Sequence, residues 1–181
     1  MTVKTDNEVW STIMRVINDG LVARGFSAEV IQAFQPVQEG VNLTPVVTVN
    51  RIMANRYGWP EDTSFWNEDT LAMKRREGYW LECTYQVNAL QAIPDVQGTE
   101  KTAFDYIDAV AAILQTSSTI EAFRMEGIGI LRVQPLRVTY WLDDKEQHEQ
   151  TPSFDFVLTY RQAVEADTNF VSTFLEIFAR V

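Results

Sequence analysis

The clearest structural pattern in this 181-residue chain is EGYWLECTYQVNAL, residues 77–90. Apolar and polar side chains alternate along it, and such alternation is typical of a β-strand with one buried face. The apolar set is Tyr79, Leu81, Cys83, Tyr85, Val87 and Ala89, and the polar set is Glu82, Thr84, Gln86 and Asn88. We therefore expect one face of this strand to meet a core and the other to meet water or a partner.

Upstream of this strand, the sequence predicts a helix and a short ambiguous element. Thr5 and Glu8 form a capping-box pattern before an apolar helical stripe, and Gly25 ends that stripe, so a helix is expected at about 5–24. Residues 28–35 fit either a short helix or a strand, and we favour the strand. The breakers Pro36 and Gly40 follow.

A hairpin is expected between these elements and the quoted strand. Its first strand lies in PVVTVNRIMANRYGW, residues 45–59, where β-forming residues dominate. The next run, PEDTSFWNED at 60–69, is rich in residues that favour turns, so we expect a polar loop there.

Downstream, the apolar pattern predicts a second helix and then a short helical turn. The helix covers 102–115, with one apolar stripe formed by Phe104, Ile107, Ala111 and Leu114. Ser118 and Glu121 form a second capping-box pattern, and the turn that it starts should end near Gly127.

Two further strands complete the expected sheet. Alternating apolar residues mark both, namely Leu136, Val138, Tyr140 and Leu142 in the first, and Phe154, Phe156, Leu158 and Tyr160 in the second. The charged run DDKEQHEQTP at 143–152 separates them. The tail, 169–181, has apolar residues at both strand and helix spacing, so a strand, an extended arm and a helix all remain open.

These elements predict an α+β fold: a mostly antiparallel sheet of four or more strands with two helices packed on one face. No repeat or shift in composition marks a second domain. Residues 1–181 are therefore expected to form a single domain, with a sheet-and-helix core at about 45–163.

Composition excludes several classes of function. The chain carries 15 basic and 25 acidic residues, and its formal net charge of -10 opposes broad binding to nucleic acid or anionic membrane. Apolar runs are too short for a membrane span or a signal-peptide core, so we expect the protein to stay in the cytoplasm in which it is made. One cysteine can form neither an internal disulfide nor a cysteine metal cluster.

The single histidine is a weak candidate for chemistry. His148 lies in the 143–152 run beside Asp143, Asp144, Glu146 and Glu149, where an acid/base or cation site can be considered. Acid/base catalysis needs a pocket that shifts pKa values, and a calcium loop needs spaced carboxylates around a central glycine. The sequence supplies neither, so a solvated hairpin tip is the favoured interpretation.

Two other motifs are also interpreted as structural. Cys83 lies on the apolar face of its strand without a basic neighbour that would activate it, so we expect a buried, inert thiol. Gly127 and Gly129 precede a strand and lack the rest of a dinucleotide fingerprint. We therefore predict no catalytic residue, no metal ligand and no cofactor.

Lys74, Arg75 and Arg76 form the only dense basic cluster, and the aromatic residues Tyr79 and Trp80 follow closely. Basic residues beside aromatic rings can bind single-stranded nucleic acid, but the net charge opposes this. An exposed strand edge whose charges prevent aggregation is the favoured interpretation. An anchor for the acidic surface of a neighbouring copy is a further alternative.

The block EGYWLECTYQVNAL and the order of the elements around it resemble the neck and tail-terminator proteins of tailed bacteriophages. The resemblance includes the TYQVNAL-type strand, the helix TAFDYIDAVAAIL and the segments GIGILRVQPLRVTYWLDD and SFDFVLTYRQ. It is strongest from about residue 45 to residue 163.

This resemblance implies a structural virion protein of the tail or neck, without enzyme activity or cofactor, assembled in the host bacterial cytoplasm. Such a protein forms a hexameric ring that closes the tail tube and joins it to the head-completion or connector complex. Its partners would be further copies of itself, the tail-tube protein and the head-completion protein, while DNA passes without specific binding. Six copies would carry -60, which would repel DNA in a channel, although the acidity could equally serve solubility alone.

Two surfaces are therefore candidates for assembly. The subunit or partner interface would include Lys74, Arg75, Arg76, Glu82, Thr84, Gln86 and Asn88. The channel or docking loop would carry Asp143, Asp144, Glu146 and Glu149. Two alternatives stay open: a small ligand-binding or enzymatic α+β domain whose pocket the sequence does not reveal, and a soluble adaptor of a bacterial secretion or contractile-tail system.

Overall fold

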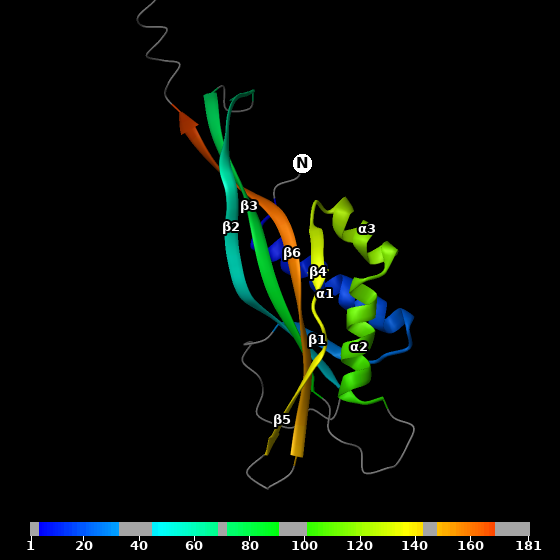
Figure 1. Ribbon diagram of the computed structural model, residues 1–181. Coiled ribbons are helices and arrows are strands. Elements are labelled where there is room, and N and C mark those ends of the chain that lie inside the picture. Colours follow the sequence, from blue (N-terminus) through cyan, green and yellow to red (C-terminus); the bar gives the residue numbers. More distant parts are fainter. Residues whose placement is uncertain (1–3, 33–44, 69–71, 91–100, 143–147, 169–181) are drawn as a thin grey trace, which may run out of the picture.

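The computed structural model describes residues 4–32, 45–68, 72–90, 101–142 and 148–168. Within these residues the chain has an α+β fold with three helices and a mixed, mostly antiparallel sheet of six strands (Figure 1). The elements in chain order are α1 (Asp6–Ala23), β1 (Glu29–Gln32), β2 (Val46–Asn67), β3 (Ala72–Leu90), α2 (Ala103–Leu114), α3 (Ser117–Met125), β4 (Gly129–Val133), β5 (Arg137–Leu142) and β6 (His148–Thr168).

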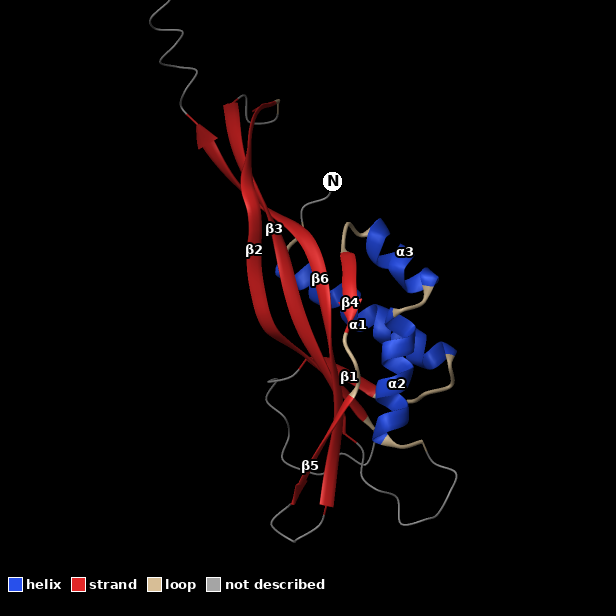
Figure 2. Cartoon of the chain, viewed as in Figure 1, coloured by secondary structure: helices blue, strands red, loops and turns tan. Residues whose placement is uncertain are grey.

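The sheet is built around β3 and β6. Its strand order is β1-β2-β3-β6-β4, and β5 also pairs with β6. The β1–β2 pair is parallel and all other described pairs are antiparallel. Figure 2 shows the helices beside the lower part of the sheet, and the upper parts of β2, β3 and β6 continue past them as a narrow ribbon.

The predicted start and end of the first helix are confirmed. At its N-terminus the Glu8 backbone N–H donates to Thr5 Oγ1 at 3.3 Å, and the Thr5 N–H donates to Glu8 Oε2 at 2.7 Å. These two bonds satisfy groups that the first helical turn leaves without intrahelical partners. Gly25 follows the helix with φ of 71°, a left-handed conformation that glycine adopts without steric cost.

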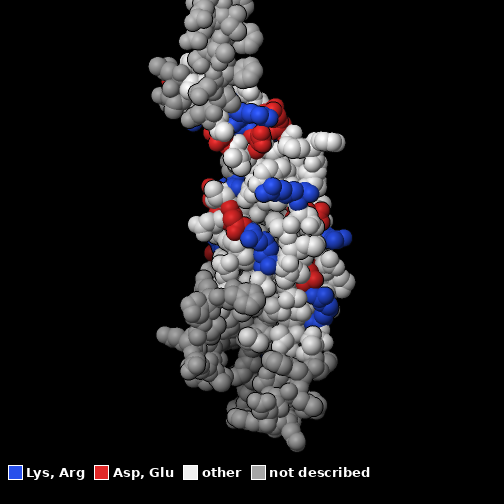
Figure 3. Space-filling view, turned by 90° about the vertical axis from the view of Figure 1, so that its left-hand side faces the viewer, with Lys and Arg blue, Asp and Glu red and all other residues white. Residues whose placement is uncertain are grey.

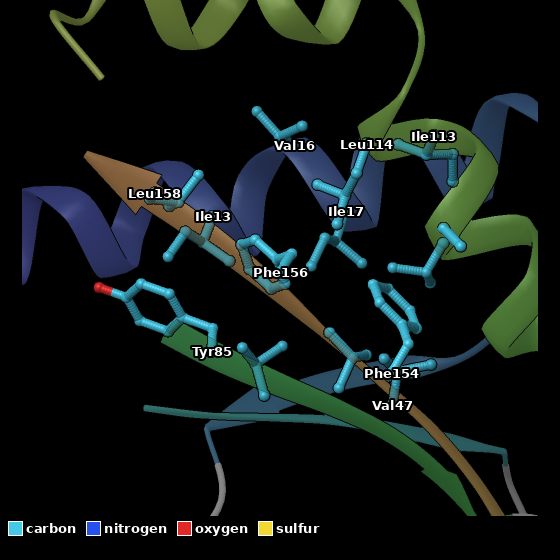
Figure 4. Close-up of a cluster of buried hydrophobic side chains, with 14 of the residues drawn as sticks. Ile13, Val16, Ile17, Val47, Tyr85, Ile113, Leu114, Phe154, Phe156 and Leu158 are labelled. Carbon is cyan, nitrogen blue, oxygen red and sulfur yellow. The ribbon is translucent and has the colours of Figure 1, made fainter. Parts of the chain in front are cut away.

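The core lies between the helices and the sheet, and the alternation of residues 77–90 is its main source. Leu81, Cys83, Tyr85, Val87 and Ala89 are buried, as are Phe154, Phe156, Leu158 and Tyr160 of β6. Figure 4 shows Ile13 and Ile17 of α1 and Leu114 of α2 above these strand residues. The rings of Tyr85 and Phe156 stack with centroids 5.4 Å apart.

The largest correction concerns the expected loop at 60–69. Residues 60–67 continue β2, because Thr63–Asn67 pair in register with Arg76–Ala72 of β3. Pro60 lacks an N–H for the sheet, and it lies where the register shifts between Tyr57 and Glu61, so it does not interrupt the pairing. The hairpin is therefore much longer than the composition indicated.

Smaller corrections concern the segment after β3. The helix α3 is capped by Thr116, whose Oγ1 accepts from the Thr119 N–H, and not by Ser118. Phe104 is exposed, unlike the other members of the predicted apolar stripe. The strand β4 was not expected as a separate element, and residues 134–136, including Pro135, separate it from β5.

Other expectations are confirmed in part or fall outside the described residues. The strand favoured for 28–35 is present as β1, and the described part of the charged 143–152 run, residues 148–152, belongs to β6 instead of a loop. Thr84 is buried although it was assigned to the polar face, because Met53 and Val157 flank it on the neighbouring strands. Pro36, Gly40 and the tail 169–181 lie outside the described residues.

Candidate assembly interface

The ribbon above the helices is the most unusual feature of the fold, and we call it the arm. It consists of β2 residues 50–67, β3 residues 72–80 and β6 residues 161–168. Below the arm, β1 covers the outer edge of β2 only at Val46–Val49, and β4 covers the outer edge of β6 only at 156–159. Among the described residues no strand pairs with either outer edge of the arm. The Lys4 N–H donates to the Arg161 carbonyl at 3.1 Å, and past this residue rows of backbone groups remain available for a partner.

Side chains of the arm are also uncovered. All residues from Arg51 to Ser64 are exposed, and the exposed set includes Ile52, Met53, Tyr57 and Trp59. Trp59 is 92% exposed, the highest value among the large apolar residues described. Exposed apolar groups gathered on one element mark interaction surfaces, and tryptophan is enriched among the residues that dominate binding energy.

A β-bulge produces the exposure of Trp59. Tyr57 is in register with Trp80 and Glu61 with Gly78, so β2 contains two more residues than β3 over this interval. Gly58 has φ of 76°, a conformation that other residues rarely adopt. The bulge re-aims the chain locally and presents Trp59 away from the sheet.

The face of the arm away from the helices is closely packed with charged and aromatic groups. Arg161 Nη2 lies 2.5 Å from Glu61 Oε2, and the guanidinium crosses Gly78, where a Cβ would come within 2.6 Å of Nη2. Tyr57 and Trp80 stack at 6.4 Å on this same face. Figure 3, which views this face, shows basic and acidic side chains interspersed with uncharged ones.

The basic cluster predicted from the sequence belongs to the arm, but it is not on a strand edge. Its strand, β3, pairs with β2 on one side and β6 on the other. Arg75 Nη2 lies 2.8 Å from Asp62, and Arg76 Nη2 lies 2.5 Å from Glu165. The Arg76 guanidinium carbon lies 4.9 Å from the centroid of the Phe65 ring. These cations therefore link the three strands. The expectation that they lie on an exposed strand edge and prevent its aggregation is wrong.

The other predicted interface residues are located below the arm. Glu82, Gln86 and Asn88 are partly buried on the face away from the helices, and Thr84 is buried there. Gln86 Nε2 donates to Asp155 Oδ1 at 3.4 Å, and Arg137 Nη2 donates to the same oxygen at 2.8 Å. This polar group spans β3, β6 and β5, so it holds strands of one chain together.

The predicted acidic loop is described only at its end. Asp143, Asp144 and Glu146 lie outside the described residues, and Glu149 is in β6 in register with Trp141. His148 starts β6 in register with Leu142. The loop therefore remains a prediction.

A polar junction connects the arm to the helices. Arg51 forms an ion pair with Asp6 at the start of α1, and the Tyr160 hydroxyl lies 3.5 Å from Asp6 Oδ1. Cys83 Sγ lies 3.5 Å from the same hydroxyl. Burial raises the pKa of the Cys83 thiol, which opposes a nucleophilic role, and the prediction that Cys83 is buried is confirmed.

The described part of the chain offers no site for two other kinds of function. No group of three or more His, Cys, Asp or Glu side chains in it could hold a metal ion. No helix in the same residues is long and apolar enough to cross a membrane.

Comparison with known proteins gives a match to a family model and matches to solved structures. Residues 8–170 match the family model of the E217 gateway protein gp29. The fold is similar to the sheath/tube terminator, in its extended state, of an extracellular contractile injection system named PVC, with a TM-score of 0.58 and 10% identity. The match covers 93% of this chain and 60% of that one, so this chain spans less than two thirds of its structural relative. No protein of curated function matches the sequence.

Proposed function

The chain belongs to the family of the E217 gateway protein gp29, and from this membership we propose a structural role in the tail or neck of a phage virion. The resemblance to phage neck and tail-terminator proteins that the sequence indicated is confirmed at the level of the family. The finer proposal is that six copies form a ring, which ends the tail tube and joins it to the head-completion complex.

The observation that carries the ring is the arm. A single chain leaves both outer strand edges of the arm unpaired among the described residues and leaves Trp59 92% exposed. Monomeric proteins seldom expose unprotected strand edges beside apolar groups, because such edges pair with other chains. Contacts repeated by a rotation between identical copies close into a ring, which would cover every arm equally.

The charge of the chain fits a ring through which DNA passes. Six copies at -10 would carry -60, and carboxylates along a channel repel DNA phosphates. We assign the channel, or the docking contact with the head-completion protein, to the loop that carries Asp143, Asp144, Glu146 and Glu149. The tail-tube protein is the second proposed partner, and the virion assembled in the host cytoplasm is the proposed location.

Electron microscopy of the purified protein, alone and mixed with tail-tube protein, tests the ring. We expect closed rings of six copies in at least one of the two samples, because the arm edges of one copy are available to the next. Particles that stay monomeric in both samples would contradict the proposal.

A second candidate role follows from the structural match. The same fold occurs in the terminator of an extracellular contractile injection system, so a ring-forming adaptor in a contractile system without a genome is the alternative. Isolation of the assembled particles distinguishes the two roles: rings attached to DNA-filled heads support the phage neck, and rings on headless tails support the alternative.

A further inference from the structure

The strand order gives the sheet two different outer edges, which we call the β2 side and the β6–β4 side. The β2 side consists of the outer edge of β2 at residues 50–66, which includes Trp59 in the bulge. The β6–β4 side consists of the outer edge of β6 at residues 162–168 and the outer edge of β4. In the described residues no strand pairs with either of these edges, and they lie at opposite ends of the strand order.

Both sides carry exposed apolar side chains. On the β2 side Ile52 is 49% exposed and Trp59 is 92% exposed. On the β6–β4 side Val164 is 60% exposed and Leu131 is 57% exposed. A partner that covers one side therefore gains apolar burial as well as backbone hydrogen bonds, and each side has the same kind of surface to offer the other.

Most charged groups on the two arm edges are paired within the chain. On the β2 edge Arg51, Glu61 and Asp62 form ion pairs with Asp6, Arg161 and Arg75, and on the β6 edge Glu165 forms an ion pair with Arg76. The Arg56 guanidinium lies 4.2 Å from the centroid of the Tyr79 ring, and no described carboxylate forms an ion pair with it. Arg56 can therefore pair with an acidic group of a neighbouring copy.

The strand directions permit this contact to repeat. The strand β2 is antiparallel to β3, and β3 is antiparallel to β6, so β2 and β6 run in the same direction. Rotation about an axis along the arm preserves that direction and also the height along the sheet. Residues 61–66 of β2, which lie at the height of residues 163–168 of β6, then meet that edge of the next copy as a parallel pair, while residues 50–57 lie at the height of β4. Because the two edges differ, the contact is heterologous, and such contacts close into rings.

We propose that neighbouring copies join through the β2 side of one copy and the β6–β4 side of the next, with Trp59 as the central anchor of the contact. This inference rests on the proposed ring and assigns the interface between neighbouring copies, which we call the seam. It also explains the bulge, which exposes a tryptophan that contributes little to the packing of its own chain.

Mixing two variants tests the seam. The first variant, Trp59→Glu, blocks the β2 side, and the second, Leu131→Glu combined with Val164→Glu, blocks the β6–β4 side. The control is Val22→Glu, which changes an apolar residue of α1 that is 65% exposed and outside both sides. Urea unfolding of each variant verifies that the changes at exposed positions leave the fold intact, and light scattering after size-exclusion chromatography measures mass.

The seam predicts a distinct result for each sample. The wild type and the control form rings, each blocked variant alone elutes with the mass of one chain, and the equimolar mixture gives dimers, because each mixed pair has one intact contact. The proposed seam is contradicted, and the proposed ring is not, if a blocked variant forms rings. The same holds if the mixture stays monomeric while the wild type forms rings. A wild type that stays monomeric alone and with tail-tube protein overturns the ring and the seam together.

Discussion

The strands β2, β3 and β6 form two regions whose side chains differ in burial. In the lower region, which we call the body, helices cover the sheet, and the facing pair Tyr85 and Phe156 on β3 and β6 is fully buried. In the arm, the pair Arg76 and Glu165 on the same two strands has side chains 39% and 40% exposed. Strand pairing continues without a break from one region to the other. The difference therefore comes from what covers the strands, and not from the strands themselves.

Because of this difference, the two regions contribute to different properties, the body to stability and the arm to assembly. Burial of one large apolar side chain contributes about 1.5–3 kcal/mol, whereas an exposed ion pair contributes about 0–1 kcal/mol. The arm is held by exposed ion pairs and by aromatic contacts such as that of Tyr57 with Trp80. We infer that the body supplies most of the free energy of folding and that the arm is kept available for other chains.

The largest expected effect is a contrast between two positions on β6. Phe156→Ala should lower the free energy of unfolding by about 3–5 kcal/mol, because it leaves a cavity against Tyr85 in the body. Val164→Ala, at a position 60% exposed in the arm, should change it by less than about 0.5 kcal/mol. Urea unfolding measures both, and equal losses would show that the arm is as important to stability as the body.

A smaller effect concerns thiol reactivity in the two regions. Cys83 is 0% exposed, so a thiol reagent should label the native protein slowly, whereas an added cysteine in Val164→Cys should react at the rate of a free thiol. Cys83→Ala should cost on the order of 1 kcal/mol. Rapid labelling of Cys83 in the wild type would show that the body opens easily.

The same thiol gives the body a pH dependence with a defined sign. Burial raises the pKa of Cys83 above the ordinary value of 9.0, so its contribution to stability is complete at lower pH and is lost as the pH rises above 9.0 toward the folded pKa. The drop in the urea midpoint between neutral and alkaline pH should therefore be smaller in Cys83→Ala than in the wild type. An equal drop in both proteins would contradict this assignment.

The body could be predicted from the sequence because burial leaves a periodic signal. The alternation at Leu81, Cys83 and Tyr85 and the cap at Thr5 each depend on local spacing, and the structure confirms them. Phe104 belongs to the predicted apolar stripe and is nevertheless exposed, because periodicity shows which residues share a helical face but not how wide the covered part of that face is.

The arm could not be predicted in the same way because no core imposes a pattern on it. The composition of PEDTSFWNED favours a loop, and only pairing with β3 makes most of this run a strand. One feature of the sequence indicated the pairing. The cations Arg75 and Arg76 form ion pairs with Asp62 and Glu165, which belong to two other segments of the chain. Opposite charges in three separate segments indicate strands that lie side by side.

Hydrogen exchange of backbone amides, compared between separate chains and assembled rings, tests the division between body and arm most directly. In separate chains we expect slow exchange in the body strands and faster exchange at the outer edges of β2 and β6 in the arm. In rings, protection should increase at residues 50–66 and 162–168 and at β4, and it should stay nearly constant in the body. Unchanged exchange at these edges, with new protection elsewhere, would contradict the account.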